Sequence, residues 1–347
     1  MKTGTENVVR LTTERLQLHL RHTFTISRGS EDIAETVLLR LAAGGIDAFG
    51  ESAPVSRYDE SPDLVASQLE KIALTEPALW RFDEALALLD DSMGARCALD
   101  LALHDLAGKR LGIPVYQLFG LDPSKALSTS FTIGIADIPT TLAKIEEARD
   151  FPILKVKVGT PQTIETLEAI RSTYRGIIRV DANEGWSAGD AVRMLHEMER
   201  FDIEFCEQPI EAGHPDQLRY VKERSKIPIV VDEDSVTSAD LPALFGCVHG
   251  INIKLAKCGG LREALRMIHT ARAMHLKIMV GCMIESSVLA TAAAHITPLC
   301  DYADLDGPLL ITDDPFSGVR YEGARLQLPD APGLGVRPLG PTAVGGR

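Results

Sequence analysis

The chain has 347 residues, of which 45% are hydrophobic and 24% are charged, a composition typical of a globular protein rather than a disordered or fibrous one. Its formal net charge of −13 argues against binding to nucleic acid or to an anionic membrane, which needs a basic surface. Residues 1–7 lack the apolar core of a signal peptide, and no apolar run approaches the ~20 residues that span a bilayer. We therefore expect a cytoplasmic protein with no membrane or nucleic-acid partner.

Residues 1–125 are predicted to form an N-terminal α+β capping domain. Polar and apolar positions alternate over the first 50 residues, and Gly44-Gly45 fits a hairpin turn of an antiparallel sheet. The periodicity then becomes helical, with Pro62 at a first helical position and Gly112 at the end of a later helix.

Residues 126–320 are predicted to form a modified TIM (β/α) barrel, the catalytic domain. Eight runs rich in Val and Ile alternate with amphipathic stretches, and equivalent positions recur every 24 to 26 residues, about one strand and one crossover helix. A doubly wound sheet would need no such uniform spacing. Residues 321–347 are expected to return to the cap. The eight equivalent positions are Phe131, Lys157, Asp181, Glu207, Asp232, Lys257, Cys282 and Asp306.

Charged residues stand at the ends of consecutive predicted strands, where a barrel places its active site. Asp181, Glu207 and Asp232 follow the third, fourth and fifth runs. Three neighbouring buried carboxylates are costly without a cation, and oxygen ligands suit Mg²⁺. We therefore predict a magnesium site on these three acids. The alternative is that each acid only caps a helix or pairs with a surface lysine.

Two lysines flank the three acids along the chain. Lys157 ends the second predicted strand and Lys257 follows the sixth, so they should face each other across an eight-stranded barrel. A substrate carboxylate on the metal would then have its α-carbon between two amines, one to remove a proton and one to return it. Lys155 shares the inward face with Lys157, and Lys254 competes with Lys257 for the role. Structural salt bridges to the acids remain the alternative.

Five motifs carry these charges: Lys155-Val156-Lys157, Val180-Asp181-Ala182-Asn183, Glu207-Gln208-Pro209, Asp232-Glu233-Asp234 and Lys257-Cys258-Gly259-Gly260. Together they resemble the muconate-lactonising subgroup of the enolase superfamily, over nearly the whole chain. The resemblance implies a capped barrel, Mg²⁺ on the three acids and two catalytic lysines. Residues 278–285 lack the histidine that the mandelate-racemase subgroup uses as a base.

Asp304-Leu305-Asp306 resembles the motif with which dipeptide epimerases hold the substrate's ammonium group. The resemblance implies a Mg²⁺-dependent 1,1-proton transfer at the C-terminal α-carbon of an L,L-dipeptide. Opposite charges at the two ends of a zwitterionic dipeptide agree with this. The alternative for Asp304 and Asp306 is a turn ahead of Pro308.

The substrate side chain is expected to meet the cap loops and nearby strand ends. Arg28 and Tyr58 lie in segments that resemble the cap loops of such enzymes, and Ile133 and Met283 are expected among the apolar walls. The apolar walls favour a hydrophobic or aromatic side chain. An L-Ala-D/L-Glu epimerase is an alternative, although Gly29 rather than Arg28 falls where those enzymes carry an arginine.

Three further functions are alternatives. An N-acylamino acid racemase or o-succinylbenzoate synthase would keep both lysines but would not need Asp304 and Asp306. A metal-dependent binding protein without catalysis could use the same barrel. A Schiff-base aldolase would use a lysine but would leave the three acids unexplained. The oligomeric state is open, with a homo-oligomer among the options.

Overall fold

The computed structural model describes residues 9–89 and 91–340. Its first three strands, β1 (Arg10–Ile26), β2 (Gly29–Ala43) and β3 (Ile46–Ser52), form an antiparallel sheet. Gly44 and Gly45, with φ of 61° and 78°, turn the chain between β2 and β3. The antiparallel sheet and the hairpin turn predicted from the sequence are confirmed.

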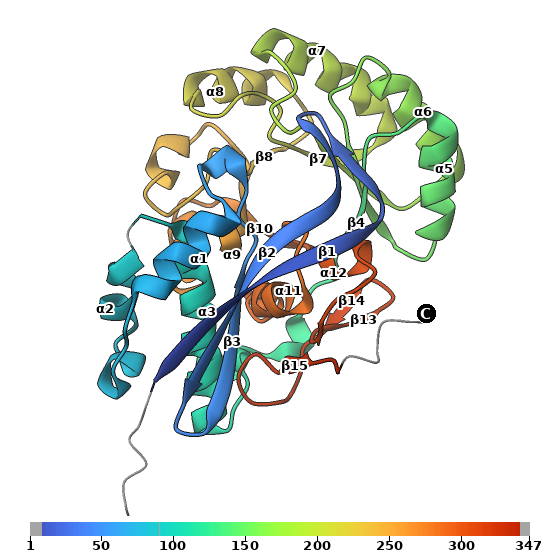
Figure 1. Ribbon diagram of the computed structural model, residues 1–347. Helices are drawn as coiled ribbons and strands as arrows, with labels where there is room; N and C mark the ends of the chain where they lie inside the picture. Colours follow the sequence, from blue (N-terminus) through green and yellow to red (C-terminus); the bar gives the residue numbers. More distant parts are fainter. Residues whose placement is uncertain (1–8, 90, 341–347) are drawn as a thin grey trace, which may run out of the picture.

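Helices cover one face of this sheet (Figure 1). The longest, α3, ends at Gly112, whose left-handed φ of 72° favours glycine. It packs so closely on β3 that a Cβ on Gly50 would lie 1.9 Å from the carbonyl oxygen of Ala98. Pro62 begins the first helix, as predicted. The helices are α1 (Pro62–Lys71), α2 (Phe82–Leu86), α3 (Met93–Leu111) and α4 (Val115–Leu118), with 3-10 turns at Ser56–Tyr58, Glu76–Trp80, Ala87–Leu89 and Pro123–Lys125.

Eight parallel strands form a barrel, as predicted. Neighbours in sequence are neighbours in the sheet, and the hydrogen bond from Ser130 N to Ala303 O, at 3.2 Å, joins the first strand's edge to the last. The strands are β4 (Phe131–Ile133), β5 (Ile153–Lys157), β6 (Ile177–Asp181), β7 (Ile203–Glu207), β8 (Ile229–Val231), β9 (Gly250–Lys254), β10 (Lys277–Gly281) and β11 (Tyr302–Asp304).

Helices surround the barrel (Figure 1). They are α5 (Ile138–Glu147), α6 (Thr163–Thr173), α7 (Ala188–Met198), α8 (Pro215–Arg224), α10 (Leu261–Ala273) and α11 (Ser287–Ala294), with 3-10 turns at Glu199–Phe201, Leu241–Leu244 and Thr297–Leu299. Two single-turn helices, α9 (Leu255–Cys258) and α12 (Gly307–Leu310), follow β9 and β11. Lys257 lies in α9, and Asp306 is the residue that directly precedes α12.

The end of the chain packs against the cap. Gly333 N donates to Ile113 O at 3.0 Å, and Leu334 N donates to Asp105 Oδ1 at 2.8 Å. The segment contains β12 (Phe316–Ser317), β13 (Arg320–Glu322), β14 (Arg325–Gln327) and β15 (Arg337–Pro338). Residues 341–347 of the predicted C-terminal segment lie outside the described residues, and the division of the chain at residues 125 and 320 stays a prediction.

The cap reaches the carboxyl ends of the barrel strands at two places. The β1–β2 hairpin crosses in front of the barrel in Figure 1, and Ser27 Oγ at its tip donates to Asn183 O at 2.9 Å. Glu51 of β3 accepts hydrogen bonds from Ser286 N, Ser286 Oγ and Leu289 N at the start of α11. These contacts close the cap over the strand ends where the charged residues lie.

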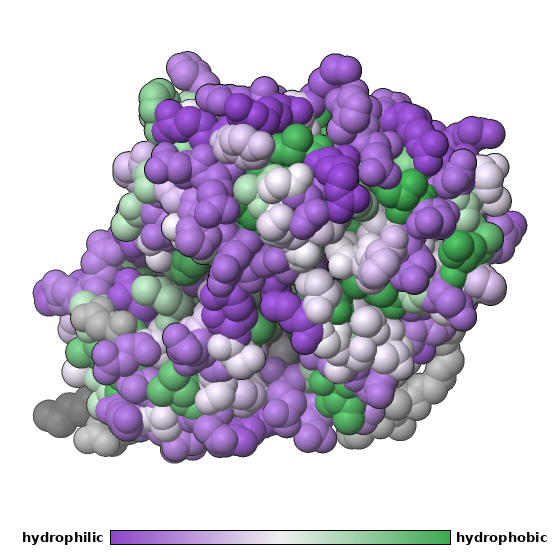
Figure 2. All heavy atoms as spheres, turned by 90° about the horizontal axis from the view of Figure 1, so that it is seen from above, coloured by the Kyte–Doolittle hydropathy of each residue, from purple (hydrophilic) through white to green (hydrophobic). Residues whose placement is uncertain are grey.

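Hydrophilic side chains cover most of the face seen in Figure 2, with hydrophobic ones scattered between them. Within the described part of the chain, no helix is long and apolar enough to cross a membrane.

Candidate active site

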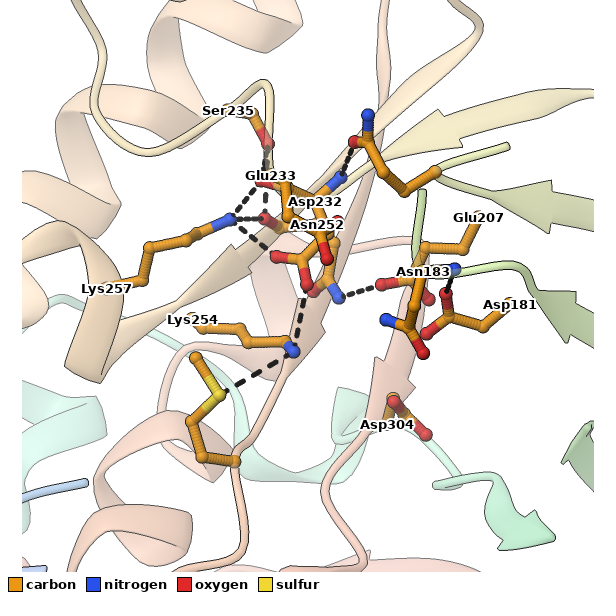
Figure 3. Close-up of polar contacts among 12 residues, drawn as sticks. Asp181, Asn183, Glu207, Asp232, Glu233, Ser235, Asn252, Lys254, Lys257 and Asp304 are labelled. Carbon is orange, nitrogen blue, oxygen red and sulfur yellow. Dashed lines mark hydrogen bonds and ion pairs between the residues drawn. The ribbon is translucent and has the colours of Figure 1, made fainter. Parts of the chain in front are cut away.

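The three predicted metal-binding acids lie side by side at the strand ends (Figure 3). Asp181 ends β6 and is paired in register with Glu207, which ends β7. Asp232 directly follows β8, and all three are at most 2% exposed. The barrel therefore brings these acids together, as their spacing predicted.

Lys155 and Lys157 of β5 neutralise part of this charge. Lys155 Nζ lies 2.7 Å from Glu207 Oε2 and 3.2 Å from Asp181 Oδ2, and Lys157 Nζ donates to Asp181 Oδ2 at 2.7 Å. Burial would raise the pKa of Asp181, but these two lysines lower it to about 2. Burial and the neighbouring Asp181 raise the pKa of Glu207. The acids thus depend on nearby cations for their charge.

Lys254 and Lys257 approach Asp232 from two sides (Figure 3). Lys257 Nζ donates to Asp232 Oδ1 at 2.7 Å and to the carbonyl oxygens of Asp232 and Asn252 at 2.5 and 3.0 Å. Lys254 Nζ lies 3.0 Å from Asp232 Oδ2. Burial would raise the pKa of Asp232, but the two lysines hold it far below its ordinary value.

The lysines line different cavities. Lys155, Lys157 and Lys254 line a cavity of about 170 Å³, whereas Lys257 lines a neighbouring cavity of about 270 Å³. Met283 lines both. The structure thus does not place Lys157 and Lys257 in one cavity, and the choice between Lys257 and Lys254 as the second base stays a prediction.

Residues 9–89 and 91–340 contain no group of three His, Cys, Asp or Glu side chains that could hold a metal ion as they stand. Lysine ammonium groups lie between the carboxylates instead. The donor set nevertheless fits Mg²⁺, because it consists of oxygens and because Asn183 Oδ1 and Asn252 Oδ1 are buried beside it without a hydrogen-bond partner. Asp181, Glu207 and Asp232 are the residues that would hold the ion.

Asn252 is a site residue to which the sequence pattern gave no role. Its Nδ2 donates to Glu207 Oε1 at 2.7 Å, so it orients the middle acid of the three. A signal was present, because Asn252 is two residues before Lys254 on β9 and therefore shares its inward face.

Asp304 and Asp306 also lie at this end of the barrel, and both are buried. Both carboxylate oxygens of Asp304 already accept hydrogen bonds, because Lys155 Nζ donates to Oδ2 at 2.7 Å and Ser130 Oγ donates to Oδ1 at 2.6 Å. Asp306 Oδ2 accepts from Thr132 N at 2.6 Å, and Oδ1 accepts from the Cys282 thiol at 3.9 Å. Burial and Asp304 raise the pKa of Asp306 to about 7.

The predicted side-chain contacts lie beside three different cavities. Arg28 and Met283 line the 170 Å³ cavity together with Asp304 and Asp306. Tyr58 lines the cavity of Lys257, and Ile133 lies apart, beside a void of about 10 Å³. Ile133 is therefore a core residue next to the site rather than a wall of the larger cavities.

Two family models match the chain. Residues 9–120 match the N-terminal domain of mandelate racemase / muconate lactonizing enzyme, and residues 140–341 match the enolase C-terminal domain-like model. These ranges correspond to the cap and to most of the barrel with the C-terminal strands.

Curated relatives and solved structures are similar over nearly the full length of the chain. An L-Ala-D/L-Glu epimerase from Bacteroides thetaiotaomicron is 38% identical, over 96% of this chain and 89% of the relative. A dipeptide epimerase from Cytophaga hutchinsonii, complexed with Mg and D-Ala-L-Val, has a TM-score of 0.89 and 28% identity, over 97% of both chains. One from Methylococcus capsulatus, complexed with Mg and L-Arg-D-Lys, has a TM-score of 0.87 and 31% identity, over 95% of this chain and 99% of that one.

Proposed function

This chain belongs to the mandelate racemase / muconate lactonizing enzyme family of the enolase superfamily, and we propose that it is a dipeptide epimerase. The reaction is a 1,1-proton transfer that inverts the C-terminal α-carbon of an L,L-dipeptide. The similar enzymes from Bacteroides thetaiotaomicron and Cytophaga hutchinsonii support this assignment.

One observation carries the proposal: cations and anions for both ends of a zwitterion line the same cavity. Lys155 and Lys157 face it from β5, and Lys254 faces it from β9 on the other side of the barrel. Asp304 faces it from β11 and Asp306 from the position just before α12. A free dipeptide has a carboxylate at one end and an ammonium group at the other. The charge pattern therefore suits a dipeptide better than an N-acylated amino acid, which has no ammonium group.

Asp181, Glu207 and Asp232 would hold Mg²⁺, which when bound stabilises the negative charge that develops as the substrate's α-proton leaves. Lys157 exchanges a proton with one face of the α-carbon, and Lys257 exchanges a proton with the other. Lys254 is the alternative residue for this second proton exchange if Lys257 remains paired with Asp232 when the substrate binds. Asp306 accepts hydrogen bonds from the substrate ammonium, because its carboxylate lines the cavity and forms no ion pair within the described part of the chain.

Solvent-exchange measurements test the function directly. L-Ala-L-Leu incubated with the protein and Mg²⁺ in D₂O should acquire deuterium at the C-terminal α-carbon, and the L,D-epimer should appear by NMR. N-acetyl-L-leucine under the same conditions should react far more slowly. Equal rates for the acetylated amino acid would support an N-acylamino acid racemase instead, and an absence of exchange across a dipeptide library would contradict both activities.

A further inference from the structure

One wall of the 170 Å³ cavity is formed by the β1–β2 hairpin. Phe24 is directly opposite Glu31 in the antiparallel register, so the two side chains project from the same face of the hairpin. Both residues line the cavity that also contains Lys157 and Asp306. Glu31 thus faces the same space as the groups proposed to bind the dipeptide.

The hairpin tip marks the end of the cavity at which the substrate carboxylate belongs. Ser27 Oγ and Arg28 Nη1 donate to Asn183 O, two residues beyond Asp181. The opposite end is marked by Asp306, which is proposed to bind the ammonium group. A dipeptide bound between these two ends would run along the hairpin wall.

Arg28 does not give this wall a free positive charge. It is the only arginine among the described residues that line the cavity, and its Nη1 lies 2.8 Å from Glu233 Oε1 and 3.1 Å from Glu184 Oε2. Glu184 also accepts two hydrogen bonds from Arg57, at 2.8 and 2.9 Å. Two arginines are thus balanced by two carboxylates, which leaves no guanidinium to bind an acidic substrate side chain.

Glu31, by contrast, has no partner of opposite charge. In residues 9–89 and 91–340 no side chain forms an ion pair or hydrogen bond with its carboxylate, and partial burial raises its pKa. Glu35 lines the same wall and accepts a 3.3 Å hydrogen bond from Gln17. The wall therefore combines apolar surface from Phe24 and Leu310 with uncompensated negative charge.

We propose that Glu31 determines substrate specificity by selecting dipeptides whose C-terminal side chain is an aliphatic stem with a cationic end, as in lysine or arginine. The stem packs on Phe24 and Leu310, and the cation pairs with Glu31. This inference rests on the proposed epimerase function. It also accounts for the apolar walls, because lysine and arginine need apolar contacts along most of their length.

The test compares two substrates that differ only in the terminal amine, L-Ala-L-Lys and L-Ala-L-norleucine. The wild type should favour lysine in kcat/KM, and Glu31→Gln should lower the lysine-to-norleucine ratio about fivefold, as for a partly exposed ion pair. Added salt should lower the ratio in the wild type but not in Glu31→Gln. Glu31→Lys should make L-Ala-L-Glu a better substrate than L-Ala-L-Lys.

Asp32→Asn is the matched control, because it removes the same charge from the next residue of the hairpin. Asp32 accepts from Thr23 Oγ1 at 2.6 Å and does not line the cavity. Its substitution should leave the ratio unchanged. An unchanged ratio in Glu31→Gln, or a preference that follows the N-terminal residue in L-Lys-L-Ala, would overturn the inference while epimerisation itself still supports the function. If no dipeptide exchanges its α-proton, both the specificity role of Glu31 and the proposed epimerase function are wrong.

Discussion

Asp306 should lower the stability of the folded protein, although it is proposed to bind the substrate ammonium group. Its pKa is raised to about 7 from an ordinary value of 3.8 by burial and by Asp304, so the ionised form is disfavoured in the folded state. Each pKa unit corresponds to about 1.4 kcal/mol, so the charge costs about 4 kcal/mol of stability at pH 8. Asp306→Asn keeps an acceptor for Thr132 N but removes the charge, and we expect it to stabilise the protein by up to that amount.

The sign of the pH dependence follows from the raised pKa. Above pH 7 the carboxylate is ionised in both the folded and the unfolded chain, and its full cost is present. As the pH falls below 7 the folded protein takes up the proton first, so the cost should fall to about 2 kcal/mol at pH 5. Urea denaturation of wild type and Asp306→Asn at both pH values measures this difference.

The same substitution should impair dipeptide turnover. A charge-assisted hydrogen bond to the substrate ammonium contributes about 1.5–3 kcal/mol, so kcat/KM for L,L-dipeptides should fall about 10- to 150-fold. The wild-type KM should rise as the pH falls below about 7, because Asp306 becomes neutral, and this dependence should vanish in Asp306→Asn. A variant that is less stable than wild type at pH 8, with unchanged KM, would refute the reasoning.

Three other substitutions or conditions give separate tests. Lys157→Ala and Lys257→Ala should each lower the rate of epimerisation about 10²- to 10⁴-fold. Each variant should still exchange the α-proton of one epimer in D₂O, and the two variants should act on opposite epimers. If Lys254→Ala shows this behaviour instead of Lys257→Ala, the second base is Lys254. Chelation of Mg²⁺ should abolish turnover, and added Mg²⁺ should restore it in the wild type but not in Glu207→Gln. Mg²⁺ should also raise the Tm of the wild type but not of this variant. Full activity after chelation would contradict the metal site. Burial lowers the pKa of His295 from 6.5 to about 4, so the neutral form is favoured in the folded protein and stability should fall by about 3 kcal/mol as the pH drops from 6.5 to 4; a melting temperature whose pH dependence is the same in His295→Gln would contradict this.

The sequence alone determined the architecture and the identity of the central charged groups. A repeat of 24 to 26 residues predicts eight strand–helix units, because each unit needs one strand and one crossover of nearly constant length. The same repeat places Asp181, Glu207 and Asp232 at equivalent heights, since parallel strands end at one edge of the barrel. The type of each element, its length and the residue at its end are local properties, so the pattern of apolar and polar residues along the chain is enough to predict them.

Tertiary structure decided which cavity each side chain lines. Lys257 lies in the single-turn helix after β9, and Asp306 lies between β11 and the single-turn helix that follows it, so strand alternation does not fix their direction. Arg28 pairs with Glu184 and Glu233, which are 156 and 205 positions away, and is therefore not available to neutralise Glu31 on the hairpin wall. Such ion pairs form only when the cap packs on the barrel, because no periodicity along the chain relates a hairpin tip to the loops it meets.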